Sequence, residues 1–222
     1  MTPYSLEISR LFHLALPVLV AQLLLASASF VDTLMAGQAG TADLAGVGVG
    51  SSLWSVCAML LVGIFMSINP TVARYFTLER YDLVADYVQQ GFWLSLPIAL
   101  LFFILLNFNQ GYLSWIVEDA AVLSVASGYL LGLSWGVPAI IGFFVLKSFG
   151  EGMAYTRAQM VSAAIGLVVN VPANYVLIFG KFGAPELGGA GCGWATSISF
   201  WVMFATLLLY AARHCAFQSV PL

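Results

Sequence analysis

The spacing of the charged residues constrains this chain more than any other feature of its sequence. Between Arg10 and Arg213, six runs of 21, 30, 31, 27, 23 and 26 residues contain no Lys, Arg, Asp or Glu. A helix needs about 20 apolar residues to cross the hydrocarbon core of a bilayer, so each run is long enough for one crossing. In lipid a helix satisfies its own backbone hydrogen bonds. We therefore predict an all-α, polytopic membrane protein, a single bundle of six transmembrane helices over residues 1–222. The approximate spans are 11–36, 44–70, 88–108, 122–146, 158–179 and 189–212.

Composition excludes several classes of protein. Hydrophobic residues make up 61% of the chain and charged residues 8%, whereas a soluble domain is about 25% charged. The net charge of −3 comes without a basic patch, which argues against nucleic acid as a partner. The three cysteines are far apart and form no CxxC pair, so we expect no metal site. No nucleotide-binding loop is present, and the two histidines, His13 and His214, lie near the chain ends and not deep in the membrane, where one could activate a nucleophile. We predict neither an enzyme nor a resident cofactor.

The basic residues predict the orientation. One side of the predicted bundle carries six of the seven, namely Arg10, Arg74, Arg80, Lys147, Arg157 and Arg213, and the other side carries Lys181. Because Lys and Arg are enriched in cytoplasmic loops, we expect a multi-pass protein of the inner (plasma) membrane with both termini cytoplasmic. The segment 14–28 also resembles a signal peptide. Glu7 cancels Arg10 before it, however, and five more spans follow, which favours retention as the first span.

Asp32 lies at the end of the first uncharged run, in 27-SASFVDTLMAG-37. One interpretation is that it marks the outer end of the first helix, where a charge costs little. The other is that it faces the bundle interior and binds a cation or a proton, since ionisable groups within a membrane are usually functional. A charge at mid-membrane costs roughly 2.5–3.5 kcal/mol on insertion scales. Position alone leaves both interpretations open.

A second candidate is 170-NVPANYVLIFG-180, in which Asn170 and Asn174 share one helix face. Pro172 between them lacks an N–H and disturbs the helix hydrogen bonds. Two amide oxygens on one face, with a carboxylate from Asp32, would suit a hard cation such as sodium. Two Asn residues also join membrane helices by ordinary hydrogen bonds, which taken alone is the better interpretation. Pro17 in the first helix is either a static kink or a hinge.

Glycines recur at helix-packing spacing in the fourth predicted span. Gly128, Gly132 and Gly136 form a GxxxGxxxG series, which predicts close helix packing and no ligand. The glycines of 46-GVGVGSS-52 do not have the spacing of a dinucleotide-binding motif, and we expect them to serve packing as well.

Several segments of the chain resemble one family of transporters. These segments are ALPVLVAQ (15–22), FVDTLMAG (30–37), INPTVAR (68–74), NVPANYVLIFG (170–180) and PELGGAGCGWATS (185–197). In order and spacing they are similar to the multidrug and toxic compound extrusion (MATE) transporters, most closely the bacterial NorM-like branch. The resemblance implies one lobe of a fold with twelve helices in two six-helix lobes. It also implies export of cationic and aromatic drugs in exchange for sodium or protons.

The resemblance also implies roles for residues of this chain. Asp32 matches the acidic residue on the family's first helix, and Asn170 and Asn174 match its partners on the fifth. Thr196 matches a threonine of the sixth helix, and Pro17 matches the proline at which the first helix bends in some members. The implied ion-binding set is therefore Asp32, Asn170, Asn174 and Thr196, with Pro17 as the hinge.

The sequence departs from the family in length, because Leu222 follows the sixth predicted span and no second lobe is present. We predict the amino-terminal half of a cation- or proton-coupled multidrug efflux antiporter. The alternative is a non-transporting truncated half, or a partner-binding membrane subunit that needs a second lobe. The expected partners are the lipid bilayer, cationic or aromatic drugs, and a second lobe or a second copy in a parallel homodimer. Sodium and proton coupling both fit the residues.

Overall fold

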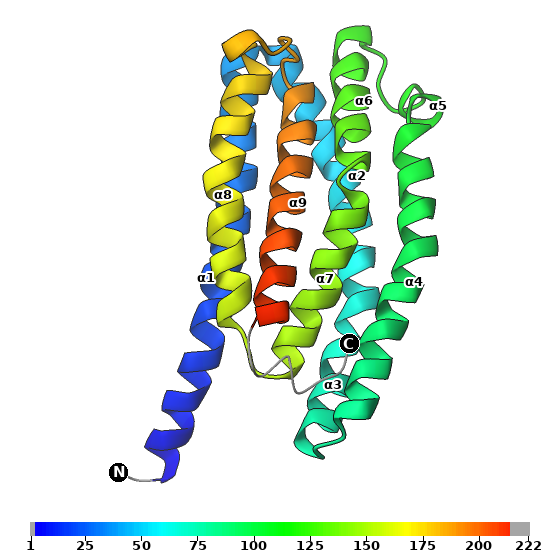
Figure 1. Ribbon diagram of the computed structural model, residues 1–222. Helices are drawn as coiled ribbons and strands as arrows, with labels where there is room; N and C mark the ends of the chain where they lie inside the picture. Colours follow the sequence, from blue (N-terminus) through cyan, green and yellow to red (C-terminus); the bar gives the residue numbers. More distant parts are fainter. Residues whose placement is uncertain (1–2, 214–222) are drawn as a thin grey trace.

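The computed structural model describes residues 3–213 as a bundle of α-helices joined by short connections (Figure 1). The elements are α1 (Pro3–Ala39), α2 (Thr41–Met66), α3 (Ile68–Thr77), α4 (Tyr81–Asn107), α5 (Gln110–Leu113), α6 (Ala120–Ser134), α7 (Val137–Gly152), α8 (Arg157–Ile178), the short 3-10 helix η1 (Lys181–Gly183) and α9 (Ala190–Arg213). No strand occurs within these residues. The all-α prediction is confirmed.

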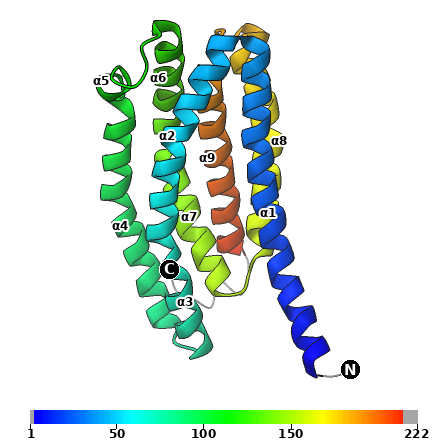
Figure 2. The same cartoon turned by 180° about the vertical axis from the view of Figure 1, so that it is seen from behind.

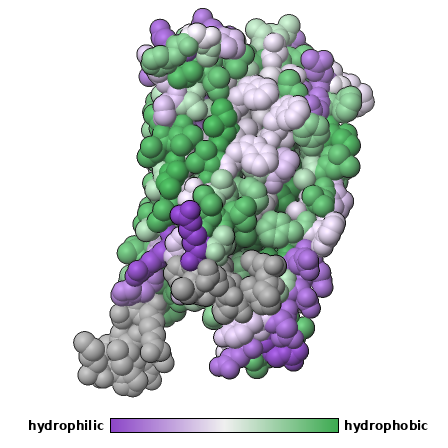
Figure 3. Space-filling view, in the orientation of Figure 1, coloured by the Kyte–Doolittle hydropathy of each residue, from purple (hydrophilic) through white to green (hydrophobic). Residues whose placement is uncertain are grey.

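The helices of the described part of the chain account for five or six membrane crossings. Five segments are long and apolar enough to cross, and α6 with α7, which are bent by 54° relative to each other, make a sixth when the pair is counted as one span. Figure 3 shows hydrophobic residues over the middle of the bundle and hydrophilic residues toward its two ends. The protein is a multi-pass membrane protein.

Two of the predicted spans are each divided between two helices in the structure. The span 122–146 is divided between α6 and α7, and 44–70 between α2 and α3. A proline removes one helix hydrogen bond, and its ring crowds the carbonyl four residues earlier. Ser134 and Met66, the last residues of α6 and α2, stand four residues before Pro138 and Pro70. These two prolines therefore account for the positions at which the helices end.

The bundle places helices from the two halves of the chain side by side. Figure 1 shows α1 against α8 on one flank and α4 on the other, with α9 beside α8 and α6. From behind, α1 and α2 cover the opposite face, and α9 is seen between them (Figure 2). The core contains fully buried Phe65, Phe143, Phe149, Leu130 and Leu133. These side chains come from α2, α6 and α7, so helices distant in sequence share one core.

Basic residues gather at one end of the bundle, the end at which α1 begins. We call it the basic end, and it carries Arg74, Arg80, Lys147, Arg157 and Arg213. Lys181 lies in η1, at the opposite end. This is the segregation that the sequence predicted, and its assignment to the cytoplasmic side stays a prediction. Residues 1–2 and 214–222, with both termini, lie outside the described residues.

The glycine series packs helices closely, as predicted. All three glycines of the series face α9, namely Gly128, Gly132 and Gly136. A Cβ atom added at Gly132 would lie 2.8 Å from the backbone nitrogen of Trp194, so only glycine allows this approach. Gly46 and Gly50 of α2 pack on α6 in the same way, whereas nothing lies within 4 Å of a Cβ added at Gly48. The packing prediction is thus confirmed except at Gly48.

Candidate ion-binding site

Asp32 lies inside the bundle, where its side chain contacts two other helices. It is 7% exposed. The Asn174 Nδ2 of α8 donates to Asp32 Oδ1 at 2.6 Å, and the Thr196 hydroxyl of α9 donates to Asp32 Oδ2 at 3.2 Å. The same Asn174 Nδ2 donates to Asn170 Oδ1 at 3.0 Å. The structure therefore brings the four predicted ion-site residues together and places Asp32 in the interior, not at an exposed helix end.

Local sequence explains why these helices meet at Asp32. Asn170 and Asn174 lie one turn apart on α8, which continues without a break past Pro172. On α9, a Cβ at Gly191 would lie 2.9 Å from the Leu177 carbonyl carbon of α8, and one at Gly193 would overlap a backbone carbonyl of α6. The close approach of α9 that these glycines permit brings Thr196 within reach of α1.

The Asp32 carboxylate has only neutral partners. In residues 3–213, no Lys or Arg forms an ion pair with it. The Asn174 Oδ1 atom is buried and accepts no hydrogen bond. The Asp32 carboxylate, the Asn170 carbonyl and the Thr196 hydroxyl supply oxygen atoms at residues that line the cavity beside Asp32, which suits a hard cation, whereas Asn174 directs its Nδ2 at Asp32 and Asn170. A buried carboxylate with neutral donors can also take up a proton, so this donor set fits sodium and a proton alike.

A cavity of about 190 Å³ lies beside Asp32. Its walls come from α1, α2, α6, α8 and α9, and they include Ser29, Ser51, Trp54, Asn170 and Thr196. Sites for drug-sized ligands measure roughly 300–1,000 Å³. The cavity is therefore large enough for a hydrated ion and too small to enclose a drug.

Pro17 is buried in α1, at the first buried position among the residues from Leu11 onward. The helix continues through it from Pro3 to Ala39. The structure thus places Pro17 where the bundle first covers α1, about two turns from the cavity-lining Leu24. Its action as a hinge stays a prediction.

Three residues near the site were not found from the sequence. Tyr129 of α6 is 4% exposed and lines the cavity. The thiol of Cys192 donates to the Asp32 backbone carbonyl at 3.6 Å, and Asp43 Oδ1 accepts from the backbone N–H of Gly189 at 2.6 Å. Only the glycines of α2 hinted at Tyr129, because a Cβ at Gly50 would meet the Tyr129 ring. The spacing of these glycines predicts close helix packing but does not show that Tyr129 is the side chain that packs against Gly50.

Comparison with known proteins identifies the family. A sequence model of the MatE family matches residues 17–176, which include Pro17, Asp32, Asn170 and Asn174. The chain belongs to the MatE family. This is the transporter family that the sequence motifs resemble, so the family prediction is confirmed. MatE proteins are transporters and not enzymes.

Relatives in this family are similar along the whole chain. Multidrug resistance protein MdtK of Klebsiella pneumoniae (strain 342) is 40% identical over 222 residues, covering 99% of this chain and 48% of that protein. MdtK of Yersinia pestis (strain Pestoides F) is 39% identical over 224 residues, covering 100% and 49%. The chain spans about half the length of these curated relatives and corresponds to their amino-terminal half.

The fold matches solved MATE structures as well. A crystal structure of MATE in complex with MaD3S aligns with a TM-score of 0.85 at 17% identity, covering 96% of this chain and 47% of that one. The fold of a MATE lobe is thereby established for this chain.

Proposed function

We propose that this chain is the amino-terminal lobe of an ion-coupled multidrug efflux antiporter, and that Asp32 binds the coupling ion, sodium or a proton. The observation that carries the proposal is a buried carboxylate held only by neutral donors, beside a cavity that admits an ion. A buried charge without a cationic partner is costly, and a bound cation or proton removes that cost. The proposal that the exported substrates are drugs is supported by the relatives, which are named multidrug resistance protein MdtK.

In this mechanism the basic end faces the cytoplasm of a cell with an inner membrane, following the positive-inside rule. The ion enters from the opposite end and neutralises Asp32. Helix α1 then shifts about Pro17, and the drug is released outward. One elementary charge crossing about 100 mV contributes roughly 2.3 kcal/mol, which is about a fiftyfold gradient. Ion and drug oppose each other through linked binding equilibria.

The drug itself binds outside the Asp32 cavity, because that cavity is smaller than drug-sized sites. A cationic or aromatic drug would bind between this lobe and a second lobe. That second lobe comes from another segment or chain, or from a second copy in a parallel homodimer. Cross-linking in native membranes that captures only monomer would remove the homodimer from consideration.

The test is drug efflux from cells in which this chain is expressed with the carboxy-terminal lobe of an MdtK relative. Asp32→Asn removes the charge and keeps the size of the side chain, so we expect ion-driven efflux to be lost. Asp119→Asn is the matched control. Asp119 is exposed and caps the start of α6, and Asn caps helices equally well, so efflux should persist. Undiminished ion-driven efflux in the Asp32→Asn variant would refute the assignment. Separate sodium and pH gradients identify the ion.

A further inference from the structure

A hollow at the basic end gathers basic and hydroxyl side chains, and no Asp or Glu of the described residues lines it. Its volume is about 410 Å³, within the range of ligand sites, roughly 300–1,000 Å³. The first part of α1, the connection between α7 and α8, and the last turns of α9 form its walls, which include His13, Tyr155, Thr156, Arg157 and Tyr210. We call it the α1–α8 hollow. Basic groups without a carboxylate among them suit an anion.

Two guanidinium groups lie here without an acidic partner. Arg157 at the α1–α8 hollow and Arg213 at an adjoining hollow are exposed, and neither forms an ion pair with a side chain that the structure describes. Arg80, at the same end of the bundle, is instead paired with Asp82 at 3.0 Å. A guanidinium binds phosphate through two parallel N–H···O bonds. The two groups therefore favour a ligand that carries a phosphate.

Thr156 gives a second and independent indication of a ligand. It is 7% exposed and lines the α1–α8 hollow, yet its hydroxyl makes no hydrogen bond to α8 or to any other part of the described chain. Helix α8 begins at the next residue, Arg157, and its first turn carries no acidic side chain. The N-terminus of a helix attracts anions through its N–H groups and its dipole. A buried hydroxyl without a partner, a guanidinium and a helix N-terminus thus meet at one anion-sized space.

The position of the α1–α8 hollow favours a lipid as the source of the phosphate. It lies where the apolar spans of α1, α8 and α9 each begin or end, which is the depth of the headgroups in a bilayer. On α1, Leu11, Phe12 and Leu16 near His13 are 66%, 65% and 58% exposed, as expected for side chains that contact acyl chains. A phospholipid brings such chains with its phosphate, whereas a soluble phosphate does not.

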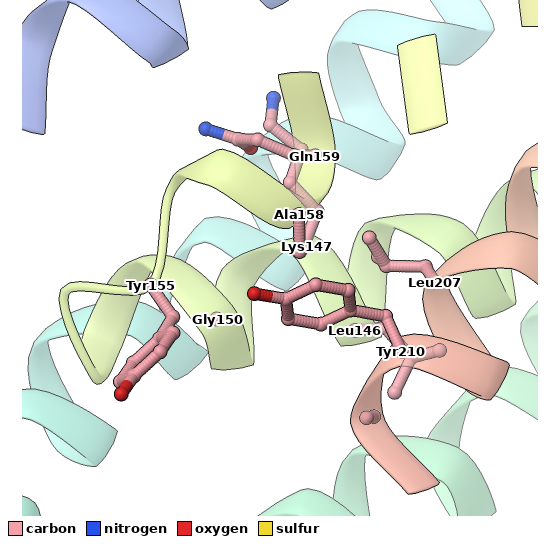
Figure 4. A pocket seen from close by; sticks show the side chains of 9 residues that line it. Leu146, Lys147, Gly150, Tyr155, Ala158, Gln159, Leu207 and Tyr210 are labelled. Atoms are coloured by element: carbon pink, nitrogen blue, oxygen red, sulfur yellow. The ribbon is translucent and has the colours of Figure 1, made fainter. Parts of the chain in front are cut away.

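Tyr155 and Tyr210 form the inner wall of the α1–α8 hollow. Both also line a small pocket of about 10 Å³ between α7, α8 and α9, together with the buried Gln159. Figure 4 shows the two tyrosine side chains at this pocket, one from the α7–α8 connection and one from α9. A space of that volume holds no more than about one water molecule. The α1–α8 hollow therefore ends at the two rings, so that a headgroup fits inside it and acyl chains remain outside.

We propose that the α1–α8 hollow binds the phosphate of an anionic phospholipid from the leaflet at the basic end. Arg157 and the Thr156 hydroxyl donate to the phosphate, and His13 faces it from α1. Basic pockets between transmembrane helices bind lipid headgroups in this way. No described carboxylate is present to pair with the ammonium of a zwitterionic headgroup, which favours a lipid with a net negative charge. The proposal does not depend on ion binding at Asp32.

Native mass spectrometry of the purified chain, released from detergent micelles, tests the preference for an anionic lipid. The probe is phosphatidylglycerol, and the matched lipid is phosphatidylcholine with the same acyl chains. Both contain a phosphodiester, but only phosphatidylglycerol has a net negative charge. We expect phosphatidylglycerol to bind at least about tenfold more tightly. Equal affinities for the two lipids would overturn the proposal.

Variants locate the bound lipid. Arg157→Gln should weaken phosphatidylglycerol binding about fivefold, which corresponds to about 1 kcal/mol, the contribution of one basic residue near an anionic membrane surface. Thr156→Val keeps the size of the side chain and should weaken binding at least about fivefold, because a hydrogen bond to a charged group is lost. Unchanged affinity in Thr156→Val would exclude the α1–α8 hollow as the site.

Arg80→Gln is the matched control for these variants. It changes the net charge of the basic end as much as Arg157→Gln does, but Arg80 is paired with Asp82 and lies outside the α1–α8 hollow. The affinity should therefore stay within about twofold of the wild-type value. A loss in Arg80→Gln as large as that in Arg157→Gln would show that the general charge of the basic end holds the lipid, and the assignment to the hollow would fail.

Equilibrium dialysis with ³²P-labelled inorganic phosphate separates a lipid from a soluble ligand. We expect no saturable binding below about 1 mM, because inorganic phosphate lacks the acyl chains that would contact α1. Saturable binding below that concentration that disappears in Arg157→Gln would show a site for soluble phosphate and would overturn the lipid assignment.

Discussion

The hydrogen bond from Asn174 to Asp32 gives a quantitative test of whether Asp32 is a buried charge. Asn174 is 0% exposed and donates to Asp32 at 2.6 Å and to Asn170 at 3.0 Å. A hydrogen bond to a charged group contributes about 1.5–3 kcal/mol, and a neutral one about 0.5–1.5 kcal/mol. Asn174→Leu removes both bonds and should lower the free energy of unfolding by roughly 2–4.5 kcal/mol.

The same replacement should cost less when Asp32 is already Asn. Both hydrogen bonds are then neutral, and the loss falls to roughly 1–3 kcal/mol. A double-mutant cycle with Asn174→Leu and Asp32→Asn should therefore give a coupling energy of about 1–1.5 kcal/mol. Because both side chains are buried, solvent screening does not reduce this value appreciably.

Equilibrium unfolding of the purified chain in detergent micelles measures this cycle. Asn107→Leu is the control, since Asn107 donates to Ser134 and to a backbone carbonyl and shares no partner with Asp32. Its effect should be additive with Asp32→Asn to within about 0.5 kcal/mol. A coupling between Asn174 and Asp32 as small as that of the control would show that Asp32 is already neutral in the resting protein, and the electrostatic argument for ion binding would fail.

Two further predictions concern helix packing and the end of the bundle opposite the basic end. Gly48→Ala should raise the free energy of unfolding by about 0.5–1 kcal/mol, because Ala favours helix and the site is open. Gly132→Ala should lower it by about 1–3 kcal/mol, because the Cβ would press on the backbone of Trp194. The same unfolding assay checks both, and equal signs would contradict the packing argument. Asp43→Ala should cost about 1.5–3 kcal/mol by leaving the Gly189 N–H without its acceptor, whereas Asp43→Asn should cost less. A loss in Asp43→Asn as large as that in Asp43→Ala would show that a neutral amide oxygen cannot replace the carboxylate, which would contradict the assignment of the loss to the missing acceptor.

The sequence predicts the crossings well because lipid leaves few alternatives to helices. It also predicts the face shared by Asn170 and Asn174, since side chains four residues apart on a helix lie together. The prolines show the limit of this reasoning. Helices end four residues before Pro138, yet α1 and α8 continue past Pro17 and Pro172. Packing around each proline decides between a break and a continuous helix, and no local pattern encodes that packing.

Contacts across the bundle were predictable only in part. The prediction of Asp32 beside α8 required α1 and α8 to be neighbours, which spacing leaves open and the family resemblance supplies. Tyr129 and Gln159 gave no signal, because one polar residue in an apolar run has the same appearance whether it faces lipid, core or cavity. Their surroundings come from glycines and helix ends far away in the chain, such as Gly50 beside Tyr129.

Under the proposed function, the geometry divides the binding of ion and drug unequally between this lobe and a second one. All four candidate ion-site residues come from α1, α8 and α9, and the cavity beside Asp32 is lined by helices of this chain. A drug exceeds that cavity and requires a second surface. Ion binding should therefore be a property of this chain by itself, whereas drug binding should not. If the ion site is complete within one lobe, a second lobe can change the affinity for the ion only through the position of α1 or α8, the helices whose movement would alter the Asp32 and Asn174 contacts.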